Sequence, residues 1–198
     1  MKCIFCDIDQ SKIENTIIEE TDYFYILPTL GSLVDGYVLI VTKRHINSMS
    51  ELNDNELEEY KTIIEKYQKL FNKIYNKTPI VFEHGTPNQN SKMKANSVTH
   101  AHTHIVNINF KNEKELLEKY NFKEINNLKE IETNKNYIKY IYNNKIYITY
   151  NFPSVSQLMR ILIAEELNYK DKFDWKKERF DENIISTIER IKGELKWK

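Results

Sequence analysis

The sequence predicts an α+β protein in which one long helix covers an antiparallel sheet of about five strands. Two observations predict this class. Short apolar segments typical of strands recur along the chain, and residues 53–75 carry apolar residues at helical spacing. The chain has 198 residues, 40 % of them apolar, which is enough for one domain with an additional segment or for two small lobes.

Composition excludes several classes of protein. Lys+Arg and Asp+Glu both number 29, so the chain lacks the global basic field that indicates nucleic-acid binding. No apolar run has the length that a membrane crossing needs, and the first residues do not resemble a signal peptide. These features predict a cytoplasmic protein without a membrane partner.

Three short segments before the long helix are expected to be strands. Residues 16–20 and 23–27 flank Thr21-Asp22, a pair typical of a turn. Residues 37–41 form the continuous apolar run Tyr-Val-Leu-Ile-Val, which is typical of a buried central strand.

The clearest helix is expected at residues 53–75. Asn53 and Glu56 offer a start that resembles a capping box. The apolar residues at helical spacing are Leu57, Tyr60, Ile64, Tyr67, Phe71 and Ile74. Because the remaining face is rich in Glu and Lys, we expect the apolar face to pack against the sheet.

The second half of the chain is expected to pack onto the first. Its expected elements are a short helix at residues 113–120, strands at 137–142 and 145–151, a helix that ends near 167 and a terminal helix at 183–195. Asn143 and Asn144 tolerate the left-handed backbone of a tight hairpin. Ser154 and Gln157 fit a capping box for the helix that follows.

Residues 98–106, Val-Thr-His-Ala-His-Thr-His-Ile-Val, contain three of the five histidines. Side chains alternate between the faces of a strand, so His100, His102 and His104 should share one side, about 6 to 7 Å apart. This spacing suits a phosphate or a metal ion, so the segment is a candidate site. The alternatives are a histidine-rich exposed strand face and a tract that binds metal adventitiously.

A second strand is expected to lead toward the histidine segment. Residues 79–82 form a short apolar run, followed by Glu83-His84-Gly85 and then a polar loop at 86–96. Ser97 stands directly before the histidine segment. We expect a hairpin that presents polar groups at one end.

Cys3 and Cys6 are the only cysteines. In a reducing compartment a disulfide is not expected, and a single Cys-x-x-Cys is typical of half a metal site or of a redox pair. Thioredoxin-type chemistry would place the pair at a strand-to-helix junction, which this position does not favour. Tetrahedral zinc needs two further ligands, for which the histidines are the good candidates.

Taken together, these features resemble the histidine triad (HIT) family. The resemblance is carried by the Cys-x-x-Cys pair, an apolar strand that ends in Lys-Arg-His45, a long helix and His100-x-His102-x-His104. It implies a HIT-like catalytic domain over residues 1–110, in a family that hydrolyses or transfers nucleotides.

Residues 111–198 more weakly resemble the C-terminal extension of bacterial family members. Those relatives carry Glu-His-Gly before the triad and a Ser-Gln-x-x-Arg helix after it, which correspond here to 83–85 and 156–160. The resemblance implies an α/β extension that packs on the catalytic domain.

The resemblance implies that the middle histidine, His102, is the nucleophile. Its neutral imidazole would attack the α-phosphorus of a nucleotide and form a nucleotidyl-histidine that water then cleaves. Imidazole suits this task because it is a good nucleophile at neutral pH. His104 is expected to donate to phosphate oxygens and to the leaving group. Ser97 matches a family position that donates to phosphate; the alternative is a loop hydroxyl bonded to its own backbone.

Zinc-bearing bacterial relatives imply a different task for His100. Their pattern, carried over, gives a closed set of Cys3, Cys6, His45 and His100, with no open position for a water. The expected metal is a structural Zn²⁺ that ties the N-terminal segment beneath the histidine strand. The alternative is a pair of reduced, metal-free thiols.

The sequence departs from the family pattern around the expected site. Tyr37 stands where relatives usually have histidine, Thr42 where they often have proline, and residues 27–29 lack the Asp of the ribose-contacting loop. His84 is the candidate replacement for the missing imidazole, as a third catalytic residue. The alternative is a loop histidine bonded to backbone.

Two residues near the start of a predicted helix are candidate substrate ligands. Arg160 is expected one turn into that helix, where a helix N-terminus attracts anions and arginine binds phosphate bidentately. The alternative is a surface charge. Gln157 is expected first as a helix cap and second as a ligand.

The leading functional prediction is a hydrolase that cleaves a dinucleoside polyphosphate or a nucleoside phosphoramidate at the α-phosphate. The alternatives are a nucleotidyltransferase or phosphorylase with the same intermediate, and a zinc-stabilised nucleotide-binding module without activity. The expected partner is a nucleotide. Small HIT proteins pair through the long helix and a sheet edge, which the second half could cover, so monomer and homodimer both stay open.

Overall fold

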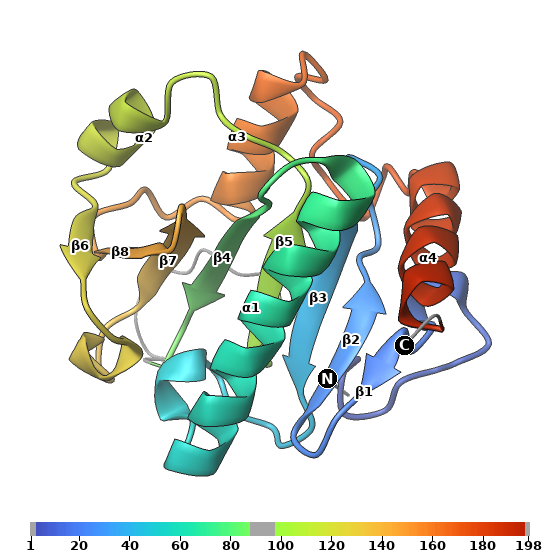
Figure 1. The fold of residues 1–198 in the computed structure, drawn as a ribbon. Helices are drawn as coiled ribbons and strands as arrows, with labels where there is room; N and C mark the ends of the chain where they lie inside the picture. Colours follow the sequence, from blue (N-terminus) through green and yellow to red (C-terminus); the bar gives the residue numbers. More distant parts are fainter. Residues whose placement is uncertain (1–2, 88–97, 197–198) are drawn as a thin grey trace.

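The computed structural model describes residues 3–87 and 98–196, which form a sheet with helices packed against it (Figure 1). Within these residues, eight strands form one antiparallel sheet in the order β1-β2-β3-β5-β4-β7-β8-β6. The strands are β1 (Glu19–Glu20), β2 (Phe24–Pro28), β3 (Tyr37–Thr42), β4 (Ile80–Gly85), β5 (His102–Val106), β6 (Lys123–Ile125), β7 (Tyr137–Tyr142) and β8 (Lys145–Thr149). The α+β class is confirmed, whereas the expected number of about five strands is too low.

Four α-helices accompany the sheet in the described part of the chain. They are α1 (Asp54–Tyr75), α2 (Glu113–Lys119), α3 (Leu158–Glu166) and α4 (Asp181–Leu195). Figure 1 shows α1 crossing the front of the sheet, and α4 packs against α1, β2 and β3. No helix among the described residues is both long and apolar enough to cross a membrane.

The long helix α1 has the predicted start and the predicted buried face. The Asn53 side chain accepts from the Glu56 backbone N–H at 3.0 Å, and the Glu56 carboxylate accepts from the Asn53 N–H at 2.9 Å. The helix ends at Asn76, which adopts the left-handed conformation. Tyr60 and Phe71 are fully buried against the sheet, as the apolar spacing predicts.

Strand β3 is buried on both faces, which confirms the prediction from its continuous apolar run. Val38 and Ile40 belong to the apolar cluster beneath α1. Leu39 and Val41 belong to a second cluster on the opposite face, which α3 covers with Ile163 and other apolar residues. The sheet is therefore the middle layer between two apolar cores.

The second half of the chain continues the same sheet. β7 pairs with β4, and β7 and β8 form a hairpin in which Asn143 and Asn144 both adopt left-handed conformations, as predicted. β6 was not expected, because its three residues show no strand pattern. We propose that residues 1–110 form a catalytic domain and that residues 111–198 form an extension that continues its sheet.

The alternative that His84 is a loop histidine is wrong, because the strand expected at residues 79–82 continues through residues 83–85. These residues form the end of β4, because β7 pairs with all three of them on one side. His84 and its neighbours are consequently buried parts of the sheet, and His84 does not lie in a loop.

Candidate active site

The histidine strand β5 lies in the interior of the sheet, between β3 and β4. His102 and His104 project to one face with their ring centroids 5.0 Å apart, as alternation predicts. On the other face, Ala101 packs in the core beneath α1, and the Thr103 hydroxyl contacts the Tyr60 hydroxyl at 2.7 Å. The pairing of β5 with strands on both sides fixes which residues face the site.

A cavity of about 280 Å³ opens over these two histidines. Its walls come from segments that are far apart in the sequence: the N-terminal segment, the loop after β2, the start of α3 and the segment before α4. The lining residues that bear on the chemistry are Phe5, His84, His102, His104, Arg160 and Trp175. The structure therefore brings most of the predicted site residues together, while Ser97 lies outside the described residues.

His102 is held in one tautomer by the backbone. Its Nδ1 lies 2.6 Å from the carbonyl oxygen of His100. A carbonyl can only accept, so Nδ1 carries the proton and Nε2 keeps its lone pair. Burial lowers the pKa of His102, against smaller opposing effects of this hydrogen bond and of Glu83. The ring is therefore neutral at pH 7, with a nucleophilic nitrogen available at the cavity.

His104 is fixed by a stacking contact and by one hydrogen bond. The Phe82 ring stacks on it at 4.4 Å with an interplanar angle of 8°. The Tyr37 hydroxyl lies 3.0 Å from Nδ1 of His104. Burial, and then the neighbouring imidazoles and the Arg160 charge, hold the pKa of His104 well below its usual range, so this ring is also neutral.

Tyr37 is a site residue, although in the sequence it stands out only as the loss of an imidazole. It is fully buried, its hydroxyl contacts His104, and its ring centroid lies 5.6 Å from the Arg160 guanidinium carbon. Burial raises the pKa of Tyr37, so the phenol keeps its proton. The alternation of β3 was the available signal, because Tyr37 shares a face with Leu39, which lines the cavity.

His84 reaches the same cavity from β4. Its ring centroid lies 6.4 Å from that of His104, and its Nε2 is buried without a hydrogen-bond partner among the described residues. Burial, with a smaller effect of His102, lowers the pKa of His84 to about 3. A neutral imidazole therefore stands in the region where the sequence lacks the usual histidine.

Arg160 is not the surface charge of the alternative prediction. Its side chain is buried, with 4 % of its surface exposed, and it lines the cavity. Its Nε donates to the Phe173 carbonyl at 2.9 Å, and its Nη2 donates to the Gly31 carbonyl at 2.6 Å. One guanidinium therefore joins two walls of the cavity and brings a positive charge to it.

The predicted capping box of Ser154 and Gln157 is wrong, because α3 begins at Leu158 and Gln157 itself occupies the N-cap position. Gln157 has a left-handed backbone and makes no side-chain capping bond at the helix start. Its amide instead donates to Asp174 at 3.2 Å and accepts from the Trp175 backbone N–H at 3.4 Å. The side chain is used to hold the segment that presents Trp175, a cavity residue that the sequence did not single out.

The four predicted metal ligands also come together. The ligand atoms of Cys3, Cys6, His45 and His100 all lie within 4.8 Å of one another. The Sγ atoms lie 3.1 to 3.6 Å from imidazole Nδ1 atoms. Zinc bonds of about 2.3 Å to sulfur and about 2.0 Å to nitrogen, at tetrahedral angles, would separate such atoms by about 3.5 Å. The residues therefore fit a metal ion of this kind.

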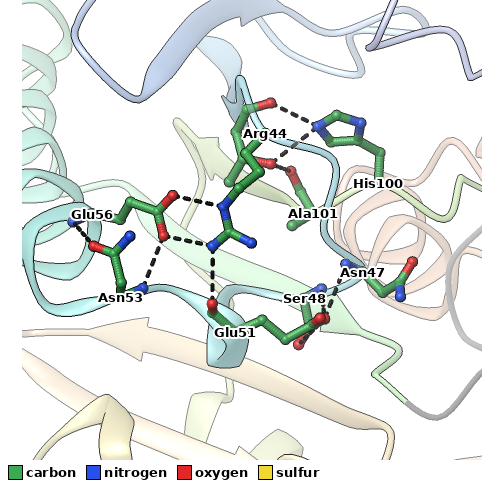
Figure 2. Close-up of polar contacts among 9 residues, drawn as sticks. Arg44, Asn47, Ser48, Glu51, Asn53, Glu56, His100 and Ala101 are labelled. Atoms are coloured by element: carbon green, nitrogen blue, oxygen red, sulfur yellow. Dashed lines mark hydrogen bonds and ion pairs between the residues drawn. The ribbon is translucent and has the colours of Figure 1, made fainter.

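Backbone and ion-pair contacts hold the histidines of this cluster in place. His100 Nε2 donates to the Thr42 carbonyl at 2.7 Å, which leaves its Nδ1 lone pair directed at the cluster. Beside His45, Arg44 forms two hydrogen bonds with the Glu56 carboxylate and one with the Glu51 carbonyl (Figure 2). These contacts join the segment after β3 to the start of α1.

A second buried polar network lies on the face of the sheet toward α1. The Lys139 ammonium lies 2.6 Å from the Glu83 carboxylate and 2.8 Å from the Tyr60 hydroxyl, which in turn contacts Thr103. Tyr137 donates to the other Glu83 oxygen at 2.9 Å. The Lys139 side chain is fully buried, and 1 % of the Glu83 side chain is exposed. The network lies directly behind the histidine strand.

Comparisons with known proteins agree on one family. The family model described as "Scavenger mRNA decapping enzyme C-term binding" matches residues 2–120. Adenosine 5'-monophosphoramidase HNT1 of Candida albicans is 25 % identical over 104 residues, which cover 52 % of this chain and 68 % of that protein. An uncharacterised HIT-like protein of Methanocaldococcus jannaschii is 29 % identical over 108 residues, covering 52 % of this chain and 77 % of that protein.

Solved structures of HIT proteins are also similar to this chain. One of them, a member of the HIT family from Bacillus subtilis, has a TM-score of 0.43 and 20 % identity, over 54 % of this chain and 72 % of that chain. The family model alone spans more than half of the sequence and includes the histidine strand. The chain belongs to the histidine triad (HIT) family.

Proposed function

We propose that this protein is a nucleotide hydrolase that cleaves at an α-phosphate through a covalent nucleotidyl-histidine on His102. The observation that carries the proposal is the 2.6 Å contact between Nδ1 of His102 and the His100 carbonyl. It leaves the Nε2 lone pair of a neutral ring at a cavity that also contains the Arg160 charge. The similarity to an adenosine 5'-monophosphoramidase supports a nucleoside phosphoramidate as the substrate class. A dinucleoside polyphosphate is the second proposed class, because it also offers an α-phosphorus to the nucleophile.

The first chemical step forms a P–N bond. The Nε2 lone pair of His102 attacks the α-phosphorus, and the bond from phosphorus to the leaving group breaks with its electron pair. The Nε2–H of the neutral His104 donates a hydrogen bond to the leaving atom, which takes its proton from a water molecule and leaves a hydroxide. The His102 ring becomes positively charged, and the His100 carbonyl, which accepts the Nδ1 proton in a hydrogen bond, stabilises that charge.

The second step restores the enzyme. The hydroxide attacks the same phosphorus, the P–N bond breaks, and its electron pair returns to Nε2 of His102. His104 stays protonated on Nε2 and donates a hydrogen bond to the phosphate oxygens. The products of the two steps are a nucleoside monophosphate and the protonated leaving group.

Four further residues have proposed roles in catalysis or in substrate binding. The Arg160 charge favours the anionic phosphates, although its Nε and Nη2 already bond two carbonyls. His84, with its unpartnered Nε2 beside His104, takes the role of the missing family imidazole near the leaving group. Gln157 acts by holding Trp175 at the cavity wall. Ser97 stays a predicted phosphate ligand.

We propose that Cys3, Cys6, His45 and His100 hold a structural zinc ion. The soft sulfur and nitrogen donors and their spacing support this choice of metal. Such an ion would cross-link the N-terminal segment to His100, two residues before β5, and thereby hold Phe5 against His102, whose rings lie 5.4 Å apart.

A panel of nucleotides with identified products tests the proposed activity. The panel contains dinucleoside polyphosphates and adenosine 5'-phosphoramidate, each incubated with and without added phosphate. A hydrolase releases the nucleoside monophosphate in both conditions, whereas a phosphorylase gives the diphosphate when phosphate is present. Lys61→Ala, on the exposed face of α1, is the matched control. Absence of turnover with every substrate, or equal turnover by His102→Ala, would favour the non-catalytic binding module.

A further inference from the structure

The partners of His104 indicate which of its two ring nitrogens carries the proton. We infer that Tyr37 is a positioning residue whose hydroxyl donates to Nδ1 of His104 and so keeps the ring proton on Nε2, at the cavity. The inference rests on the proposed function, because the Nε2–H is the donor that would face the leaving group.

The direction of the hydrogen bond follows from the surroundings of Tyr37. The hydroxyl and Nδ1 are 3.0 Å apart, so either group could donate. If Nδ1 donated, the phenol proton would need another acceptor. Tyr37 is fully buried, and its hydroxyl contacts no other acceptor within the described ranges of the chain. Donation from Tyr37 satisfies both groups, as buried polar groups require.

Arg160 favours the same direction. Its guanidinium carbon lies 5.6 Å from the centroid of the Tyr37 ring, and arginine has donors but no acceptor. The nearby positive charge also acts to lower the pKa of Tyr37, against the larger effect of burial. A phenol beside a cation is a stronger donor and a weaker acceptor, so its proton points to His104.

The two site histidines then have opposite tautomers, and each tautomer suits the proposed task of its ring. His102 faces a carbonyl, which accepts its Nδ1 proton and leaves a bare Nε2 for attack. His104 faces a hydroxyl, which donates to Nδ1 and leaves an Nε2–H that can donate a hydrogen bond to the leaving group. The stacked Phe82 ring fixes the plane of His104, so the proton also has a fixed direction.

The tautomers can be measured without any substrate. Long-range ¹H–¹⁵N NMR correlations of the protein labelled at histidine report which ring nitrogen is protonated, and His104→Gln assigns the signals. We expect His104 protonated on Nε2 and His102 on Nδ1 in the wild type. In Tyr37→Phe, His104 should gain an Nδ1-protonated population while His102 is unchanged. A wild-type His104 with its proton on Nδ1 would overturn the inference, even if Tyr37→Phe did not fold.

Kinetics separate a positioning role from a merely structural one. Two adenylate substrates are compared, one with a poor amine leaving group and one with p-nitrophenol, which leaves without protonation. A hydrogen-bond donor aimed at a developing charge contributes about 10²- to 10³-fold, so Tyr37→Phe, which only misplaces that donor, should lower kcat about 10-fold with the amine and less than about threefold with p-nitrophenol, at similar KM. Equal losses with both substrates would contradict the inference.

Tyr67→Phe is the matched control. It removes one hydroxyl of a buried tyrosine on the α1 side of the sheet, where Tyr67 donates to Glu19 at 3.1 Å. It should change neither the tautomer of His104 nor the difference between the two substrates. If the wild type turns over no nucleotide, the proposed function fails, while the NMR result still decides the inference about Tyr37.

Discussion

At β4 and β5, the buried polar groups on one face of the sheet form a complete set of contacts with one another, whereas those on the other face are only partly bonded. On the α1 face, Glu83 and Lys139 form an ion pair that two tyrosine hydroxyls complete. On the cavity face, His84 keeps an unpartnered Nε2, and His102 and His104 are each bonded through one nitrogen in the described structure. The same two strands therefore carry a closed network on one side and open functional groups on the other.

The difference explains the electrostatics of the site. A buried charge is tolerated when a partner of opposite charge compensates its desolvation, as for Lys139. The imidazoles lack such a partner because Glu83, the carboxylate of β4, points to the other face and is engaged there. Burial therefore lowers their pKa values and keeps them neutral. The closed face acts as the scaffold, and the open face is available for chemistry.

The largest effect is expected on activity, at the open face. His102→Ala removes the proposed nucleophile and should lower kcat at least about 10³-fold. The free energy of unfolding should change by less than about 1 kcal/mol, because His102 is only partly buried at the cavity. Steady-state kinetics and urea unfolding measure the two quantities. A loss of activity below tenfold would contradict the separation of the two faces.

The next effect is expected on stability, at the closed face. Lys139→Met leaves the Glu83 carboxylate buried without its charge partner and should lower the free energy of unfolding by about 3 to 5 kcal/mol. Lys61→Met breaks an exposed pair with Glu58 and should cost less than about 1 kcal/mol. Urea unfolding compares the two variants. Equal losses would show that the network is not the scaffold that its burial indicates.

The sequence predicted those parts of the molecule that depend on local pattern. Alternation placed His102 and His104 on one face, the Asn53 capping box started α1, and Asn143-Asn144 formed the hairpin turn. The spacing of the Cys-x-x-Cys pair and the histidines, through the family resemblance, gave the four ligand atoms that lie within 4.8 Å of one another. The first three depend on residues that are close in the chain, whereas the ligand set depends on the motif of the family.

The rest depends on contacts between distant segments. Tyr37 meets His104 only because β3 pairs with β5, and Trp175 reaches the cavity through contacts with Gln157 and the loop after β2. Nothing in the sequence near Glu83 or Lys139 indicates that they are buried, because the two meet only when β4 pairs with β7. No local pattern specifies these neighbours, so the sequence alone could not assign their roles.

Metal removal should affect stability more than the chemistry of the open face. The protein purified without added metal should contain about one zinc per chain, and Cys6→Ser should contain much less. When the free concentration of an ion is 100 times its dissociation constant, binding stabilises the folded state by about 2.7 kcal/mol. We therefore expect removal of the metal to lower the free energy of unfolding by an amount of this order. Ser11→Ala, on the same exposed segment, is the control. Zinc near zero with both thiols freely titratable would contradict the proposed site.

The smallest effect is expected from pH. The pKa of His84 is about 3 in the folded protein and 6.5 in its ordinary state, so the unfolded chain binds the proton more strongly. Stability from this group is present above pH 6.5 and is lost as the pH falls toward 3, by about 1 kcal/mol between pH 6.5 and 5.5. His84→Gln should reduce this slope in urea unfolding. An unchanged slope would indicate that His84 is not buried as a neutral group.

The central claim is that His102 carries the nucleotide during turnover, and trapping the intermediate tests it most directly. The protein is mixed with adenosine 5'-phosphoramidate, quenched within one turnover at alkaline pH, digested, and analysed by mass spectrometry. We predict an adenylate on the peptide that contains His102, absent after acid treatment and absent in His102→Ala. Turnover that proceeds with no adduct, or with the adduct on another residue, would contradict the claim.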